Sequence, residues 1–509
     1  MSKTPAQQDF DIDADADNDV HGEEAGLMDS YTKIHPSWDS VEPMSLDQIL
    51  DRVGLGWYFI RLLLVIGSVA VSEGAQIILI TICTIMTQNQ WHYNDGTRTA
   101  LIAGSFLGVV AGSSLSGLFA DKIGRRKPML VSLIVMTLLN LASAFAPNIL
   151  VFIILRTALG IALGFFAPIG FTMVAENTPR DYRGGVIVLA NAAMFVGELL
   201  ACFIAYLVLD DYVNGNWRAT ILWFTVPFAL AIVLNLLFLD ESLRYLMVAG
   251  RFEEAFKLMD KILKVNKHKN FTKLTELQKA RLQAWEHNLE QEVTEEETAS
   301  VKALFKGKNK RLTLIIWFGW FASFFVYYGI IIYLPLTLSQ FQEVGHAKEG
   351  EINETPKNTL DISRITVSIL VESLSTIIAF AALYAKFISR QKFLIIVFIL
   401  TGIISLLNAF YLPVNVYLIF ITITKILNNT CTFYYYIFTL ESYPTKNRAT
   451  ALGTAIAFGK VATVIMPFIC LGVSQIYFLA PYLVFSLLCF TASFSLSRLD
   501  QSMEEHELK

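Results

Sequence analysis

Gly117-Leu-Phe-Ala-Asp-Lys-Ile-Gly-Arg-Arg-Lys127 decides the fold, because this short basic stretch lies between two long apolar segments. Glycine permits close backbone approach or a sharp turn, so Gly117 and Gly124 predict a tight hinge between two membrane helices. Asp121 can cap a helix end or pair with a cation, and the three cations after Gly124 keep the loop on one side of the membrane. The stretch follows the second of twelve apolar segments, and this position makes it informative.

The composition excludes an ordinary soluble protein, because 54% of the 509 residues are hydrophobic and only 17% are charged. Apolar spans of about 20 residues are long enough to cross a bilayer. We therefore predict an all-α membrane protein. Its spans are expected at 58–86, 98–119, 128–146, 149–175, 185–208, 218–239, 312–336, 363–385, 393–411, 414–439, 449–473 and 476–497.

The polar segments predict the rest of the domain organisation. Residues 1–45 are expected to be a disordered acidic tail without a signal peptide, and 498–509 a second tail. The spans form bundles 46–239 and 312–497. Between them, the linker 240–311 contains apolar residues at helical spacing, which predict an amphipathic helix. These residues are Phe252, Ala255, Phe256, Met259, Ile262 and Leu263.

The positive-inside rule orients the chain. The loop 120–127 contains Lys122, Arg125, Arg126 and Lys127, and the loop 386–392 contains Lys386, Arg390 and Lys392, whereas 87–97 contains no Lys or Arg. We expect these basic loops, the linker and both termini to be cytoplasmic, in a plasma or vesicle membrane. Asn353 then lies in an external loop, 337–362, and is a glycosylation acceptor if the cell is eukaryotic.

One offset of 265 residues relates the two sets of spans. It places Asp121 on Lys386, and it places Glu176–Arg183 on Glu441–Arg448, which share the pattern Glu-x-x-Pro-x-x-x-Arg. An even number of spans in each half predicts two parallel six-helix pseudo-repeats. The Glu and Arg of each pattern could form a clasp that closes the cytoplasmic side, or they could be simple helix-end pairs.

Several motifs resemble the major facilitator superfamily. The stretch 117–127 resembles its signature, and Arg156-Thr-Ala-Leu-Gly-Ile-Ala-Leu-Gly164 resembles its fourth-helix motif. Tyr327-Tyr-Gly329 and Glu441–Gly453 resemble the branch that holds the synaptic vesicle glycoproteins, their related protein and the organic ion transporters. The resemblance implies a twelve-helix fold whose first, fourth, seventh and tenth helices line a central cavity. Sugar transport is disfavoured, because the seventh span lacks paired Gln residues.

Charged and aromatic residues inside the spans, with the amide Gln76 one turn from Glu73, are candidates for substrate binding or proton coupling, because polar and ionisable groups in a membrane are costly. They are Glu73, Gln76, Arg156, Glu198, Tyr327, Tyr328, Glu372, Lys425, Tyr435 and Lys460. Glu73 could bind a cationic substrate against a tyrosine ring, could be a proton site, or could form a structural pair with a cation. Lys425 could attract an organic anion, or could neutralise Glu372 or Glu73.

These residues predict a secondary transporter of a small charged organic solute, with proton coupling as one possibility and alternating access as the mechanism. The alternatives are a non-transporting vesicle-type binding or trafficking protein with the same fold, and a proton-coupled phosphate, carboxylate or sugar porter. No phosphate-binding Gly-Lys-Ser loop and no catalytic constellation is present. We expect no enzyme, cofactor, metal or nucleic-acid partner. All five Cys lie in apolar spans, so we expect no disulfide framework, and we expect a monomer in the lipid bilayer.

Overall fold

The computed structural model describes residues 45–179, 182–209, 215–266, 274–284, 304–307, 309–349, 362–384, 389–443 and 448–499. The predicted acidic tail, Asn353, Lys386 and residues 500–509 lie outside the described residues, as do the side chains of Asp121, Glu441 and Arg448.

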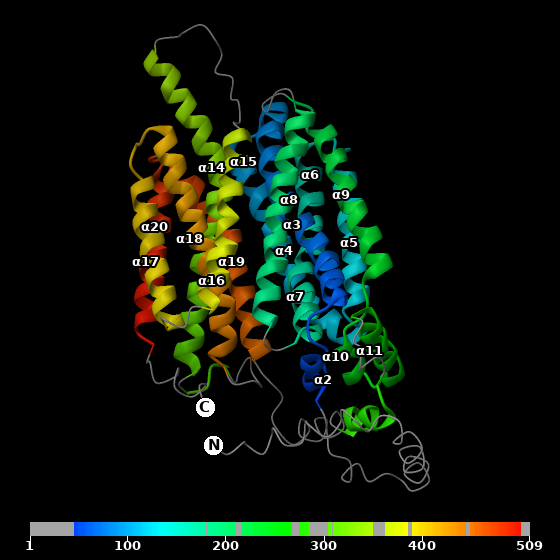
Figure 1. The fold of residues 1–509 in the computed structure, drawn as a ribbon. Coiled ribbons are helices and arrows are strands. Elements are labelled where there is room, and N and C mark those ends of the chain that lie inside the picture. The colour runs from blue at the N-terminus through cyan, green and yellow to red at the C-terminus, as the bar shows by residue number, and fades with distance from the viewer. Residues whose placement is uncertain are drawn as a thin grey trace. The chain divides into compact units, whose positions relative to one another are not determined.

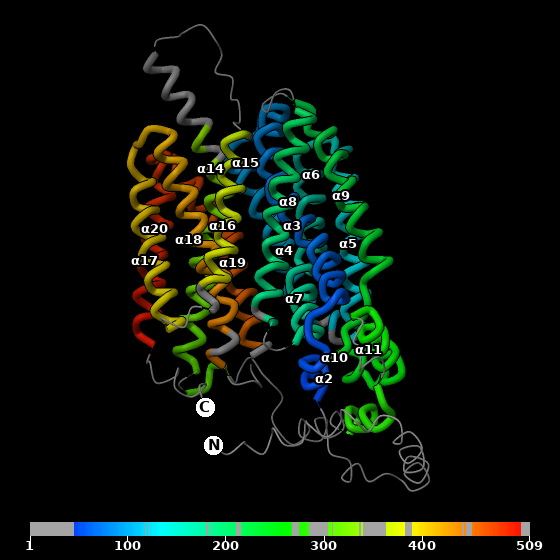
Figure 2. Tube along the Cα trace, in the orientation of Figure 1, coloured from blue at the N-terminus to red at the C-terminus, as the bar shows by residue number. Residues whose placement is uncertain are grey.

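Twelve helical segments of the described chain are long and apolar enough to cross a membrane, as the sequence predicted. They run along one common direction (Figure 2). The first six spans comprise α3 (Trp57–Trp91), α4 (Asp95–Ile123), α5 (Arg126–Ser143), α6 with α7 (Ile149–Gly164 and Phe166–Asn177), α8 (Arg183–Val208) and α9 (Trp217–Phe238). The second six comprise α14 (Asn309–Glu349), α15 with α16 (Ile362–Glu372 and Leu374–Tyr384), α17 (Arg390–Asn408), α18 (Val414–Glu441), α19 (Arg448–Ser474) and α20 (Ala480–Ser497).

The chain forms two compact units, of which the smaller comprises Met1–Tyr58 and Leu243–Thr298. In this unit α2 (Leu46–Val53) begins with a capping box, because the Ser45 and Gln48 side chains each accept a hydrogen bond from the other's backbone N–H. The helices α10 (Leu243–Val248) and α11 (Phe252–Asn266) follow. The predicted amphipathic helix is confirmed as α11, which buries the apolar positions Ala255, Met259, Ile262 and Leu263.

The larger unit, Phe59–Ser242 with Ala299–Lys509, contains both sets of six spans. Figure 1 shows α3 to α9 as one group of helices and α14 to α20 as another. Within the first group α4 packs on α6, and within the second α17 packs on α18 and α20. The two groups contact each other where α4 meets α19 and where α8 meets α15 and α16.

Glycine brings α4 and α6 into backbone contact. A Cβ added to Gly108 or Gly112 of α4 would meet the carbonyl oxygen of Thr157 or Ile161 in α6. A Cβ added to Gly164 of α6 would in turn meet the backbone of α4. Both helices therefore place glycines four residues apart on one face, which is the small-residue packing that membrane helices use in place of a hydrophobic driving force.

We expect Gly112→Val to abolish most of the folded protein, because its side chain would push α4 away from α6. Overpacking costs about 1–3 kcal/mol where side chains can yield, and a backbone carbonyl yields less. The matched control is Gly117→Val in the same helix, since no described heavy atom lies within 4 Å of a Cβ at Gly117. Size-exclusion chromatography of the two variants measures this. Equal monodisperse yields would contradict the close α4–α6 contact.

The structure corrects two predicted boundaries. The predicted loop 120–127 is mostly helical, because α4 continues to Ile123 and α5 starts at Arg126. Gly124 supplies the turn with a φ of 93°, whereas Gly117 lies inside α4 and makes neither a turn nor a close approach. The predicted external loop 337–362 is also helical up to Glu349, since Leu, Gln, Glu and Ala after the apolar span all favour a helix.

Candidate functional site

The interior of the larger unit contains five charged side chains that are almost inaccessible. Their exposed fractions are 2% for Arg156, 0% for Glu198 and Glu372, 3% for Lys425 and 5% for Lys460. Glu73 is only partly buried. Buried charges are costly unless they are paired or take part in function, so the partners of each one decide its role.

Arg156 of α6 is joined to α3 through Gln76. Its Nη1 donates to Gln76 Oε1 at 3.0 Å, and Gln76 Nε2 donates to Asn140 Oδ1 of α5 at 3.2 Å. The guanidinium carbon lies 5.0 Å from the centroid of the Phe152 ring. Among the described residues, Arg156 Nε and Nη2 have no hydrogen-bond partner. Arg156 is thus a buried cation that presents unused donors.

Asn140 was not among the site residues predicted from the sequence. Its Nδ2 donates to the carbonyl oxygen of Ile221 at 3.2 Å and to Thr225 Oγ1 at 3.1 Å, both in α9. These bonds hold the Asn140 amide in place, and its oxygen accepts the hydrogen bond from Gln76. Asn140 therefore orients Gln76, which in turn accepts the hydrogen bond from Arg156. A buried Asn in the middle of an apolar span is the signal that could have indicated it.

Glu73 and Lys460 form a second charged centre, from α3 of the first group and α19 of the second. They are close enough for their charges to interact, and Lys460 Nζ donates to Ser113 Oγ of α4 at 2.7 Å. Tyr328 of α14 also lies within electrostatic range of Glu73. This centre therefore joins the two groups of helices. Ser113 was not among the predicted residues.

Glu198, Tyr327, Glu372 and Lys425 form a third centre. Tyr327 of α14 donates its hydroxyl hydrogen to Glu198 Oε1 of α8 at 3.2 Å. Lys425 of α18 forms an ion pair with Glu372 of α15, and Asn429 Nδ2 donates to the other oxygen of Glu372. Of the two carboxylates predicted as partners of Lys425, the structure therefore places Glu372 next to it.

Tyr435 and its neighbour Tyr436 lie in different surroundings. Both rings pack on Trp320 of α14, with centroids 5.7 Å away for Tyr435 and 4.6 Å for Tyr436, but the fully buried Tyr435 also packs on Phe398 of α17, inside the second group of helices. Tyr436 packs on Phe171 of α7 at 5.8 Å and lies within electrostatic range of Glu73. Consecutive helical residues point about 100° apart, so only one of the two tyrosines can face the first group of helices. The sequence predicted Tyr435 as the candidate residue, whereas in the structure Tyr436 lies at the contact between the groups.

The turn between α4 and α5 is held by two acidic side chains, Glu176 of α7 and Glu241 from the segment between α9 and α10. Glu241 Oε1 accepts from the backbone N–H groups of Arg125 and Arg126 at 2.8 and 3.1 Å, and so caps the start of α5. Glu176 at the end of α7 accepts from Arg125 Nη2 at 3.1 Å and from the Ser242 hydroxyl. Arg125 is a partner of Glu176 that the sequence did not predict.

The predicted clasp residue Arg183 donates from Nε to the carbonyl oxygen of Thr178 at 3.0 Å. Arg126 Nη2 donates to the carbonyl oxygen of Leu236 at 3.3 Å, and Lys127 is exposed. The gating roles of Glu176 and Arg183 stay predictions. Those of Glu441 and Arg448 stay predictions as well, because their side chains lie outside the described residues.

We expect Glu241→Ala to lower the free energy of unfolding by about 1–2 kcal/mol, because the first turn of α5 would lose its acceptor. Thermal unfolding of the purified protein in lipid nanodiscs measures the change in midpoint. Glu253→Ala is the control, since Glu253 is an exposed carboxylate at the start of α11. Equal midpoints for the two variants would show that the cap contributes nothing.

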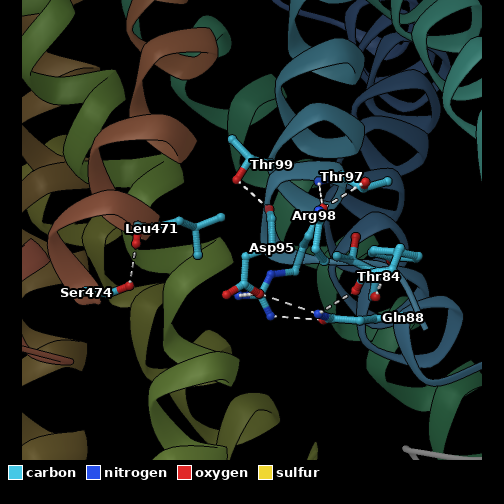
Figure 3. A network of polar contacts seen from close by, with 10 residues as sticks. Thr84, Gln88, Asp95, Thr97, Arg98, Thr99, Leu471 and Ser474 are labelled. Atoms are coloured by element: carbon cyan, nitrogen blue, oxygen red, sulfur yellow. Dashed lines mark hydrogen bonds and ion pairs between the residues drawn. The ribbon is translucent and has the colours of Figure 1, made fainter. Parts of the chain in front are cut away.

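The turn between α3 and α4 contains a separate polar network (Figure 3). Arg98 donates to Gln88 Oε1 at 3.0 Å and pairs with Asp95 at 3.0 Å. Tyr93 donates its hydroxyl hydrogen to the carbonyl oxygen of Thr84 at 2.8 Å, and burial raises the pKa of Tyr93 to about 12. The phenol therefore stays a neutral donor at physiological pH, and the network fixes the turn.

No group of three or more His, Cys, Asp or Glu side chains in the described part of the chain is arranged to hold a metal ion. All five cysteines are buried free thiols in the structure.

Comparisons with known proteins agree with this architecture. Residues 68–496 match the family model described as sugar (and other) transporter. The chain is 26% identical to the synaptic vesicle 2-related protein of Xenopus laevis over 88% of this chain and 79% of that one. It is 25% identical to the organic cation/carnitine transporter 7 of Arabidopsis thaliana over 84% and 88% of the two chains.

A solved structure with a similar fold is the inward-open xylose transporter XylE from E. coli, with a TM-score of 0.64 at 16% identity over 88% of this chain and 98% of that one. Twelve candidate membrane spans and this likeness show the fold of a polytopic protein of the major facilitator type. The chain belongs to the sugar (and other) transporter family.

Proposed function

We propose that this protein is a secondary transporter of a small organic solute that bears a carboxylate, and that Arg156 binds that carboxylate. The observation that supports the proposal is the guanidinium itself, which is 2% exposed and has two nitrogens without a described partner. Leaving buried charged donors unsatisfied is costly, and a planar carboxylate accepts two parallel bonds from a guanidinium. A carboxylate solute would supply both missing acceptors.

The relatives are compatible with such a solute. One of them is named an organic cation/carnitine transporter, and carnitine bears both a quaternary ammonium group and a carboxylate. A zwitterion could use Arg156 for its anionic end and the ring faces of Tyr328 or Tyr436 for its cationic end, since cations bind aromatic faces. A purely cationic solute would leave the donors of Arg156 unsatisfied.

Proton coupling is the second part of the proposal, and Glu73 would be the coupling group. Glu73 is only partly buried, and it interacts electrostatically with Lys460 of the other half. A proton on Glu73 would remove its electrostatic attraction for Lys460, and because Lys460 also bonds Ser113 of α4, this would change the contact between the halves. Alternating access would then occur as the halves rock around the solute, with the turn at Gly124 and its acidic partners on the cytoplasmic side.

The test is uptake into proteoliposomes of labelled carboxylates, zwitterions, cations and neutral sugars, with and without a pH gradient. We expect uptake of a carboxylate or of a zwitterion. We also expect a pH gradient, acidic inside or acidic outside, to change the rate of that uptake. Uptake of cations or sugars alone would contradict the role of Arg156. Tight binding of one ligand without uptake of any compound would instead support a non-transporting binding protein and overturn the proposal.

A further inference from the structure

The contact between α8 and the second half contains more buried negative charge than positive charge. Glu198 and Glu372 are both 0% exposed, and Lys425 is the described cation that interacts with both. Two carboxylates and one ammonium leave one uncompensated negative charge away from water. Burying such a charge is strongly unfavourable, so one further positive charge is required.

The hydrogen bonds show which carboxylate lacks a partner. Glu372 has a charged partner, because its Oε2 forms the ion pair with Lys425 although it accepts no hydrogen bond of good geometry, and its Oε1 accepts from Asn429. Glu198 accepts one bond, from the Tyr327 hydroxyl to Oε1, and its Oε2 has no hydrogen-bond partner among the described residues. The missing positive charge therefore belongs at Glu198 Oε2.

The ionisable groups that interact with Glu198 come from several helices. Tyr327 and Tyr328 come from α14, Glu372 from α15, Lys425 from α18 and Cys202 from α8 itself. The ionisable residues of the neighbours α7 and α9 bond elsewhere, since Glu176 pairs with Arg125 and Arg218 donates to the carbonyl oxygen of Ala146. On the neighbouring α3, Glu73 interacts with Lys460 and Tyr328. None of these groups supplies a second cation, and Arg364 of α15 is not among the charges that act on Glu198.

We propose that Glu198 is a proton-binding site at the contact between the two halves, and that its carboxyl is protonated in this conformation. A metal ion does not fit, because the described residues contain no group of three or more suitable ligands. An organic cation is not required, because a proton supplies the missing charge at Glu198 Oε2 without opening the contact in which Glu198 is 0% exposed. The bond that forms is Oε2–H, and Tyr327 continues to donate to Oε1.

The proton has a structural consequence, because Glu198 belongs to the first half and its partners belong to the second. With the proton bound, the cluster is neutral and the α8–α15 contact is stable. Its loss places a second carboxylate charge beside Glu372, and this repulsion favours separation of the halves. The existence of the site does not depend on the proposed function, whereas its coupling to transport does rest on that proposal.

Infrared difference spectroscopy of the full-length, solute-free protein in nanodiscs tests the site, because a protonated carboxyl has a C=O stretch that a carboxylate lacks. All variants are made in a Glu73→Gln background, which removes the other candidate carboxyl. At neutral pH we expect a protonated-carboxyl band that Glu198→Gln removes. Glu372→Gln should also remove it, because Lys425 would then neutralise Glu198. Lys425→Met should about double it.

A band that persists in Glu198→Gln or in Glu372→Gln, or no band in the parent protein, would overturn the inference. If Glu198→Gln does not fold, Tyr327→Phe tests the assignment of the band to Glu198. Loss of the hydrogen bond from Tyr327 should raise the frequency of the C=O stretch. An unchanged frequency would contradict the assignment. The two proposals fail separately. Absence of uptake would leave the band intact, and absence of the band would leave the uptake of a carboxylate unaffected.

Discussion

Arg156→Gln is expected to weaken binding of a carboxylate solute by about thirtyfold or more, because removing one member of a buried charged pair costs about 2–5 kcal/mol and each 1.4 kcal/mol is a factor of ten. Glutamine can still bond Gln76 but provides neither the charge nor the paired donors. Arg156→Lys keeps the charge without the planar fork, so an intermediate loss is expected. Concentration dependence of uptake, together with equilibrium binding in detergent, measures the change.

Arg218→Gln is the matched control for this experiment. Arg218 also lies in a membrane span of the first half, but it stacks on Trp217 at 4.5 Å and donates to the carbonyl oxygen of Ala146. It should therefore leave solute affinity unchanged. If Arg156→Gln and Arg218→Gln had equal affinities for the solute, the unused donors of Arg156 would have another purpose and the proposed anion site would be wrong.

Glu73→Gln is expected to abolish accumulation driven by a pH gradient while leaving exchange of labelled for unlabelled solute in place. Gln approximates the protonated carboxyl but cannot release a proton, so the carrier could cycle only with solute bound. Counterflow and gradient-driven uptake, measured on the same proteoliposomes, separate the two activities. Accumulation with an unchanged pH dependence would show that Glu73 is a structural residue.

Lys460→Met provides the complementary experiment, because it leaves Glu73 without its neighbouring cation. We expect a lower yield of folded protein, since a carboxylate inside the membrane would lose its compensation. The double variant Glu73→Gln with Lys460→Met is electrically neutral again and should recover the yield without recovering accumulation. Equal yields for Lys460→Met and the double variant would show that these two charges do not interact.

The sequence by itself determined the class of fold and the number of spans. Apolar segments of sufficient length can only be membrane helices, because lipid satisfies no backbone hydrogen bond, and this is a local property of the chain. The same reasoning identified each of the buried charged residues that the structure describes, since a charge inside a span is visible without any knowledge of packing. It also predicted the turn at Gly124, which depends on the conformational freedom of a single residue.

Only the tertiary structure decided which charges are partners. Glu176 could pair with Arg183 by spacing, yet Arg125 reaches it from the turn between α4 and α5. Lys425 had two candidate carboxylates, and α15 places Glu372 beside it. Such choices depend on how helices distant in sequence are rotated and shifted against each other. A shift of one residue turns a side chain by about 100°, which is why Tyr436, and not Tyr435, reaches α7.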